Sequence, residues 1–520
     1  MMIEAPSDDI PCDILLIIFG HYLDVSAPSW FKLTHVCRRW RWIIFKSPLG
    51  LRLQLHCTYG TPVLKNLECW PPFPLVMNYG GSLFLPPPSP QDEDNIMAAL
   101  KHSDRACSIS LTVSSSLLKK LSTISEPFSE LEELVLLSKH DLQLTLPSAF
   151  WWGHRLRTLH STRIAFPSLP QLLLPSQDLV DLQLNEIPAV GYFSPEAFAN
   201  ALCGMTQLET LSLHFLSLPP RRNYLSLPPP PGDRVVLPAL TCFKYRGISK
   251  YLDSLVARID APRLEDIDIT FFSQPTLDAL QLGLFIDRIK MWRKSVRANI
   301  LSSQSAISIT LTQPEPLNTR LQLQISCRQL DWQLFSISHI CDHFSSFLFG
   351  VEDLGITATG LSNVPDDMNG EQWLRLISAF GGTKNLRVAG DLAADVLRAL
   401  CSLAADEGHE SALPALRNLF VQVPTVMRGP TQDFLEQFLS QRQLSGHPVH
   451  YSWLPTVEEV TSAKRWIEEQ KRLAFGHSSF NRILIQFGFR FSNLSHSLQV
   501  SMGSPARRFQ RVKSKSTSEI

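Results

Sequence analysis

Short runs of alternating apolar and polar residues recur through the middle of the chain, most often as Leu-x-x-Leu-x-Leu. The clear copies occupy Leu131/Leu134/Leu136, Leu179/Leu182/Leu184, Leu208/Leu211/Leu213, Leu264/Ile267/Ile269 and Leu416/Leu419/Val421. Looser copies begin at Leu156, Leu240, Val351 and Leu386. Successive side chains of a strand point to opposite faces, so the last two apolar positions of each copy share one face. Each copy therefore predicts a short strand with one buried side.

Stretches with helical periodicity separate these strands. They are predicted at residues 194–204, 251–260, 277–294, 371–380 and 392–405. Alternation of strand and helix predicts parallel strands with helices covering one side. Between Leu131 and Leu264, neighbouring copies start 23 to 32 residues apart, and a period of this length is typical of a leucine-rich-repeat solenoid. We predict an irregular α/β solenoid of this kind over residues 105–455, with an ordinary α/β domain as the open alternative.

Residues 300–350 interrupt the repeat. Two alternating runs, Ala306–Thr312 and Arg320–Ser326, flank the sequence Gln313-Pro314-Glu315-Pro316. The pattern fits a β-hairpin inserted in the array, and it equally fits two divergent repeats.

Two apolar helices are predicted before the solenoid, within residues 10–50. Pro11 suits a first helical position, and Asp13 places negative charge at the positive end of the helix. One stripe of this helix consists of Leu15, Ile18, Phe19 and Tyr22. Its other side is also apolar, with Ile14, Leu16 and Ile17. A helix that is apolar on both sides is expected to be covered on both sides.

These helices resemble an F-box. The first half of the family motif is matched by Ile10-Pro11-Cys12-Asp13, Ile18-Phe19 and Leu23, and the second half by Leu33 and Val36-Cys37-Arg38-Arg39-Trp40. Ile10 replaces a leucine, and the loop 24–30 lacks the usual Asp-Leu pair. The connector, residues 51–104, contains Gly60-Thr61-Pro62-Val63 and Cys69-Trp70-Pro71-Pro72. It is similar to the connector that follows the F-box in large fungal F-box families.

The resemblance implies a substrate-recognition subunit of an SCF-type cullin–RING ubiquitin ligase, in the ubiquitin-conjugation pathway. The F-box would bind a Skp-family adaptor, and through it a cullin, while the solenoid holds a target protein whose identity the sequence does not reveal. By family match, the adaptor-binding residues are Ile10, Pro11, Leu15, Ile18, Phe19, Leu33, Val36, Cys37 and Trp40. The alternative is an adaptor-binding scaffold protein that acts outside ubiquitination.

Target binding is predicted on the face of the solenoid strands opposite the buried leucines. The residues expected there are Asp181, Gln183, Asn185, Thr210, Ser212, His214, Lys244, Arg246, Asp266, Asp268 and Thr270. The row is polar and mixed in sign, as suits a protein-binding surface, although any solvated sheet face has a similar composition.

The two ends of the chain are predicted separately. Residues 456–475 include a charged amphipathic helix, expected to cap the solenoid. Residues 476–520 form a largely disordered basic tail in this prediction, and residues 1–9 a short N-terminal tail.

The amino-acid composition limits which binding partners and which cellular compartment are expected for this chain. The 520 residues carry no net formal charge, so no global field favours nucleic acid or an anionic membrane. The ten cysteines show no C-x-x-C pair. The acidic start of the chain differs from a secretory leader, and no apolar run is long enough to cross a bilayer. We expect an intracellular protein, cytoplasmic or nuclear.

Candidate chemistry is sparse. None of the common nucleophile, phosphate-loop or metalloprotease motifs occurs, so we expect neither an enzyme nor a cofactor. His339, Cys341, Asp342 and His343 cluster in sequence, but without a second ligand pair no metal site is predicted. The segment Arg38–Trp42 mixes cations with aromatics, as single-strand binders do. Because Trp40 lies on the buried stripe, a solvated helix face is the favoured interpretation.

Overall fold

A computed structural model describes residues 10–455, except for the segments 27–29, 48–50, 52, 81–87, 125, 140–143, 147–152, 218–232, 275–276, 278, 290–295, 314–318, 359–369, 406–412 and 424–427. The chain divides into two units, Met1–Trp453 and Leu454–Ile520. The predicted capping helix, the basic tail and the tail 1–9 lie outside the described residues.

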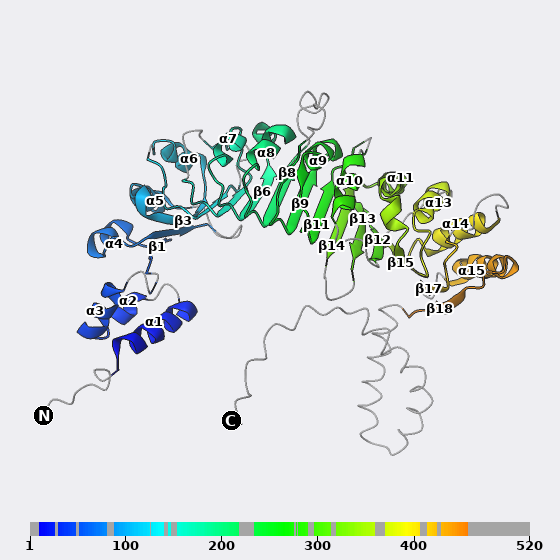
Figure 1. Cartoon of the computed structure of the whole chain (residues 1–520), viewed down its shortest axis with the longest axis horizontal. Helices are drawn as coiled ribbons and strands as arrows, with labels where there is room; N and C mark the ends of the chain where they lie inside the picture. Colours follow the sequence, from blue (N-terminus) through cyan, green and yellow to red (C-terminus); the bar gives the residue numbers. More distant parts are fainter. Residues whose placement is uncertain are drawn as a thin grey trace, which may run out of the picture. The chain divides into compact units, whose positions relative to one another are not determined.

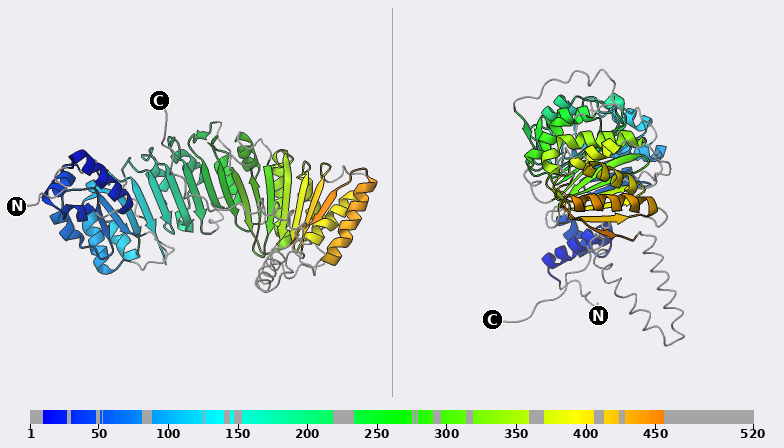
Figure 2. Two further views of the ribbon diagram at one scale, coloured as in Figure 1. Left: turned by 90° about the horizontal axis from the view of Figure 1, so that it is seen from below. Right: turned by 90° about the vertical axis from the view of Figure 1, so that its right-hand side faces the viewer.

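One sheet of sixteen strands runs through the first unit (Figure 1). Its strands are β1 (Leu55–Thr58), β2 (Leu75–Tyr79), β3 (Ala106–Thr112), β4 (Glu133–Leu137), β5 (Thr158–Thr162), β6 (Asp181–Ile187), β7 (Thr210–Phe215), β9 (Cys242–Gly247), β11 (Asp266–Phe271), β12 (Val296–Ser302), β13 (Ala306–Thr312), β14 (Arg320–Ser326), β15 (Val351–Ala358), β16 (Asn385–Gly390), β17 (Asn418–Gln422) and β18 (His450–Trp453). A separate pair is formed by β8 (Val235–Val236) and β10 (Ile259–Asp260). Figure 2 shows the strands of the large sheet side by side.

Helices cover one side of this sheet, and many of them pack against a helix that neighbours them in sequence (Figure 1). Those after the N-terminal region are α5 (Pro90–Leu100), α6 (Ser115–Leu121), α7 (Leu169–Leu173), α8 (Pro195–Ala201), α9 (Ser249–Val256), α10 (Leu280–Arg288), α11 (Leu330–His343), α12 (Ser345–Leu348), α13 (Gly370–Ser378), α14 (Ala393–Ala405) and α15 (Arg428–Leu444). The helices predicted at 277–294 and 251–260 are present but shorter. No helix within the described ranges is long and apolar enough to cross a membrane.

Parallel pairing in register builds the core. Leu134 of β4 pairs with Leu159 of β5, and the same row continues through Leu182, Leu211, Phe243 and Ile267. Each of these side chains is fully buried. The leucine spacing therefore marks real strands, and the sheet of strand–helix units agrees with the predicted solenoid rather than with a single closed α/β domain.

The region 300–350 contains the hairpin. The sheet order runs β11-β14-β13-β12-β15, and β13 pairs antiparallel with both β14 and β12. The chain thus crosses from β11 to β12, returns through β13 to β14 beside β11, and then continues through α11 to β15. Every other strand pair described in the large sheet is parallel. Helix α11 packs over β13 and β14.

The sheet begins earlier than predicted. Sequence analysis places the start of the solenoid at residue 105, but β1 and β2 already extend the sheet to Leu55. The connector also contains the start of α5, at Pro90. Ser89 caps this helix, because its hydroxyl accepts from the Asp92 amide while the Asp92 carboxylate accepts from the Ser89 amide. A proline at the first helical position is compatible with such a start.

Helices α1 (Cys12–Ser26), α2 (Trp30–Thr34) and α3 (Arg38–Lys46) precede the sheet. They share a small core with the connector, which also holds α4 (Val63–Cys69). The Trp30 ring lies edge-on to Trp70 and Phe73, with centroids 5.0 Å and 5.3 Å away, and its Nε1 donates to the Gln54 carbonyl at 2.8 Å. The helical segment is therefore attached to the sheet by an aromatic cluster.

We predict that Gly390→Ala lowers the free energy of unfolding by at least about 2 kcal/mol. Gly390 has φ of +83°, and a Cβ there would overlap the Ala358 carbonyl oxygen. The matched control is Gly20→Ala in α1, where nothing lies within 4 Å of the added methyl and helix propensity should improve. Urea unfolding of the full chain measures both. Equal midpoints for Gly390→Ala and the unmodified chain would contradict the backbone geometry at β16.

Candidate functional site

The structure divides the nine predicted adaptor residues by burial. Three are in the core of the helical segment: Leu15, Phe19 and Leu33. Three are exposed: Pro11, Ile18 and Val36. The remaining three, Ile10, Cys37 and Trp40, are half-buried. Only the exposed members are available to touch a partner directly, and the buried ones support them from below.

A set of large apolar side chains faces solvent on the same segment. The exposed apolar set consists of Ile14, Ile17, Ile18, Phe31 and Val36, with exposed fractions between 42% and 59%. The three isoleucines lie at i, i+3 and i+4 on α1, opposite the buried Leu15 and Phe19. Ile14 and Ile17 were not among the predicted interface residues. Their signal in the sequence is the apolar character of both sides of this helix.

Backbone contacts hold the three helices in place. The Arg39 guanidinium donates to the Ile10 carbonyl, and the Arg41 Nε donates to the Thr34 carbonyl at 2.9 Å. Cys37 caps α3, since its sulfur accepts from the Trp40 amide at 3.4 Å. The exposed apolar set therefore lies on a segment whose three helices are fixed to one another rather than on an isolated helix. Exposed apolar side chains that share one helix face, as Ile14, Ile17 and Ile18 do, commonly mark an interaction site.

The outward face of the sheet, opposite the covering helices, brings the eleven predicted target residues together, but Ser212 is only 2% exposed and cannot contact a partner directly. One row across the strands is Asp181, Thr210, Cys242 and Asp266; the next is Gln183, Ser212, Lys244 and Asp268; the third contains His214, Arg246 and Thr270. Asn185 is linked to this group through Ser212, whose hydroxyl lies 3.4 Å from the amide oxygen of Asn185.

Most carboxylates on this face have partners. Asp181 lies 2.7 Å from His160 and accepts from the Gln183 amide at 3.1 Å. Arg320 of β14 lies 3.6 Å from Asp266 and 3.5 Å from Asp268.

The cations on β9 differ. Lys244 and Arg246 form no ion pair among the described residues, and the Arg246 guanidinium lies 5.8 Å from the centre of the Phe272 ring. Burial lowers the pKa of His214, and the nearby charges of Arg246 and Lys244 lower it further. The middle of the outward face therefore carries local positive potential.

Further along the sheet, the same face contains a hydrogen-bonded ladder. Arg297 lies 3.2 Å from Asp353, Asn385 donates to Asp353 at 2.6 Å, and Asn418 donates to Asn385 at 2.7 Å. These four residues occupy one row across β12, β15, β16 and β17. Sequence reasoning missed this ladder, although the repeat copies at Val351, Leu386 and Leu416 pointed to it.

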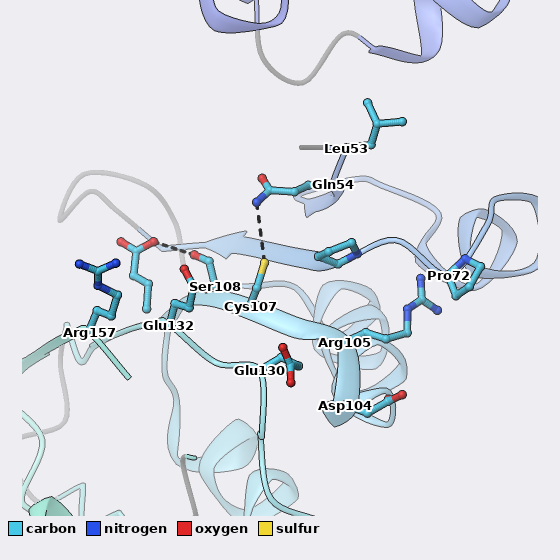
Figure 3. Close-up of a pocket in the computed structure, with 12 residues that line it drawn as sticks. Leu53, Gln54, Pro72, Asp104, Arg105, Cys107, Ser108, Glu130, Glu132 and Arg157 are labelled. Carbon is cyan, nitrogen blue, oxygen red and sulfur yellow. Dashed lines mark hydrogen bonds between the residues drawn. The ribbon is translucent and has the colours of Figure 1, made fainter. Parts of the chain in front are cut away.

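A groove of about 790 Å³ lies where the connector meets the first strands (Figure 3). Its lining includes the acidic side chains of Asp104, Glu130, Glu132 and Glu133. Internal contacts use many of its polar groups. Arg105 donates twice to the Phe73 carbonyl, at 3.0 Å and 2.9 Å, and the Ser108 hydroxyl donates to Glu133 at 2.8 Å.

The thiol in this groove is not activated. Burial, with a contribution from the neighbouring glutamates, raises the pKa of Cys107 to about 11. At neutral pH the sulfur is therefore protonated and a poor nucleophile.

The histidine pair on α11 does not gather a metal centre. The rings of His339 and His343 lie 5.3 Å apart, but Cys341 is buried and Asp342 pairs with Arg375. Among the described residues, no group of three or more potential ligands lies together.

Comparisons with known proteins add little. No protein-family model matches the sequence, and no curated protein matches it significantly. Among solved structures, the chain is similar to the leucine-rich repeat-containing protein LegL7 from Legionella pneumophila. That match has 11% identity and a TM-score of 0.26, and it covers 74% of this chain and 97% of the other. A TM-score this low does not establish a shared fold, so the repeat architecture rests on the sheet order and register above.

We predict that Arg246→Gln raises the pKa of His214, because it removes a positive charge that disfavours the imidazolium. NMR titration of the full chain with ¹³C-labelled histidine measures the change. Arg297→Gln, on the same face but on β12, should leave His214 unchanged. A His214 pKa that stays constant or falls in Arg246→Gln would contradict the described electrostatics.

The lowered pKa of His214 also makes the stability of the fold depend on pH. As pH falls below 6.5, the unfolded chain binds a proton at this histidine before the folded chain does. The free energy of unfolding therefore decreases as pH falls from 6.5 through the folded pKa.

Proposed function

We propose that this chain is the target-recognition subunit of an SCF-type cullin–RING ubiquitin ligase, acting in the cytoplasm or nucleus. Helices α1–α3 bind a Skp-family adaptor, and the outward face of the sheet binds a target protein. The observation that carries the proposal is the exposed apolar set, which lies in the segment whose sequence resembles an F-box and includes Ile18 and Val36 of the motif.

The two-sided character of α1 supports adaptor binding. Leu15 and Phe19 bury one side of the helix in the small core, while Ile14, Ile17 and Ile18 leave the other side in water. Burying a large aliphatic side chain fully contributes about 1.5–3 kcal/mol, so an uncovered group of this kind is costly unless a partner covers it. An apolar surface on a partner helix would cover the exposed isoleucines of α1.

The attachment of the helices supports a role in positioning. Trp30, Trp70 and Phe73 pack the helical segment against the connector, and the connector continues into the sheet through β1 and β2. A target on the sheet would thus be tethered to the adaptor by a packed joint. In this proposal the chemistry belongs to other subunits, and the chain supplies proximity, which contributes several kcal/mol when reacting groups are held in place.

The second candidate is an adaptor-bound scaffold that acts outside ubiquitination. It shares the adaptor surface and differs only in the rest of the assembly. Purification of the full chain from cells separates the two: adaptor together with cullin supports the ligase, and adaptor without cullin supports the scaffold.

We predict that Ile17→Ala combined with Val36→Ala weakens adaptor binding by ~30-fold, because two exposed anchors worth ~2 kcal/mol together are lost. Both side chains are more than half exposed, so the melting temperature should hardly change. Biolayer interferometry of the full chain against purified adaptor gives the ratio. Leu15→Ala is a poorer probe, since Leu15 is buried and its loss destabilises the segment itself.

The control for the adaptor experiment is Leu284→Ala, which removes a leucine of 47% exposure from α10, compared with 57% for Ile17 and 59% for Val36. It should bind adaptor as the unmodified chain does. Undiminished binding by Ile17→Ala/Val36→Ala, or no adaptor binding by the unmodified chain, would refute the adaptor assignment.

We also predict that Lys244→Glu combined with Arg246→Glu changes the set of proteins captured by crosslinking mass spectrometry in cells. The pair reverses the unpaired positive charge on β9 while leaving the helical segment untouched. Lys250→Glu with Lys119→Glu makes the same charge change on exposed helix positions and should leave the captured set unaltered. An identical captured set in both variants would place target recognition off this face.

A further inference from the structure

A second surface on the helical segment lies on α3. Arg38, Arg41, Trp42, Phe45 and Lys46 line a hollow of about 380 Å³, here called the α3 hollow. Their spacing puts them on one face of the helix. Trp42 is 58% exposed, which is unusual for so large an aromatic side chain. None of these five residues belongs to the exposed apolar set.

The charge of this helix is one-sided. The nine residues of α3 contain four cations and no acid. Arg38, Arg41 and Lys46 form no ion pair among the described residues, although charged groups elsewhere in the structure are commonly paired. The α3 hollow therefore presents positive charge that the described part of the chain does not neutralise.

The position of two of these charges is unfavourable for the helix itself. Arg38 and Arg39 occupy the first turn of α3, where the helix dipole already carries partial positive charge. Acidic residues stabilise that position, and arginines are repelled there. Arg39 has a structural role, because it donates to the Ile10 carbonyl. Helix stability does not explain Arg38, whereas attraction of an anionic partner does.

The hollow is preorganised by the core beneath it. The Phe45 ring lies 6.4 Å from Trp30, 6.4 Å from Trp70 and 6.2 Å from Phe73, centroid to centroid. Ile43 and Ile44, on the opposite side of α3, are buried. Lys46 Nζ lies 5.6 Å from the centre of the Trp42 ring, a cation–π arrangement that holds the lysine beside the hollow. Little ordering would be needed on binding.

We propose that the α3 hollow docks an acidic segment of a partner protein. Carboxylates of the segment pair with Arg38, Arg41 and Lys46, and an apolar side chain between them packs against Trp42. Charge complementarity carries this assignment, and aromatic and arginine anchors are the residues that most often dominate such contacts. The inference does not depend on the proposed adaptor complex.

A nucleic-acid strand fits the hollow less well. Single-strand binders track the backbone along a groove and stack successive bases on several aromatic rings. Here one exposed ring is available, and Phe45 is half-buried beneath it. The hollow has room for one apolar side chain with charged neighbours.

Fluorescence anisotropy of the full chain with a labelled Glu-Glu-Phe-Glu-Glu peptide tests the proposal. Arg38→Glu combined with Lys46→Glu should weaken binding by about tenfold or more, with a salt-dependent difference. Trp42→Ala, which keeps every charge, should also weaken it. The uncharged Ser-Ser-Phe-Ser-Ser peptide should bind the unmodified chain at least about tenfold more weakly. Arg38, Trp42 and Lys46 are all exposed, so the variants should remain folded. If the double charge reversal nevertheless unfolds the segment, Trp42→Ala still tests the proposal.

The matched control is Lys65→Glu combined with Lys101→Glu, which makes the same change of charge at two exposed positions outside α3. The unmodified chain and all variants keep the basic residues at the C-terminal end. Unchanged peptide binding in this control supports the α3 hollow. Equal loss in the control and in Arg38→Glu/Lys46→Glu would overturn the proposal in favour of diffuse attraction. Tighter, Trp42-dependent binding of a ten-nucleotide thymidine strand would overturn it in favour of nucleic acid. Loss of adaptor capture by Trp42→Ala would show that the hollow belongs to the adaptor surface instead.

Discussion

In-register parallel pairing decides which side chains of this protein meet solvent. From β4 to β11 each strand aligns its buried positions with those of its neighbour, so Leu134, Leu182 and Ile267 lie in one continuous row. A slip of one residue would turn every buried side chain outward. The polar residues between them are consequently fixed on the outward face, and their cross-strand pairs, such as Arg320 with Asp266, follow from the same alignment.

The helical segment depends on this sheet. Its core is small, and part of that core comes from Leu55, Phe73 and Leu75 at the first strands. A segment of this size rarely buries enough surface to fold alone. Attachment through Trp30 gives α1 one covered side and leaves Ile14 and Ile17 uncovered. The proposed adaptor would complete the burial that the chain itself does not provide.

Much of the sheet could be predicted from local patterns, because alternation assigns each residue to a face without any knowledge of its neighbours. Register pairing then brings the eleven polar residues into neighbouring rows of the sheet. The first strand of the sheet could not be recognised from the repeat, because the segment at Leu55 lacks the leucine spacing. The choice of a hairpin at β13–β14 depends on long-range pairing, which local pattern does not contain. On α1, periodicity showed two apolar sides but could not tell that Leu15 is buried and Ile17 is not.

Hydrogen–deuterium exchange of the full chain, with and without purified Skp-family adaptor, tests the central claim most directly. Exchange reports the local opening of each segment, and burial of an exposed surface slows it. The account predicts added protection in α1 and in the turn at Val36, with little change in β6, β7, β9 and β11. Protection that appears only in the sheet, or no change at α1 under saturating adaptor, would contradict it.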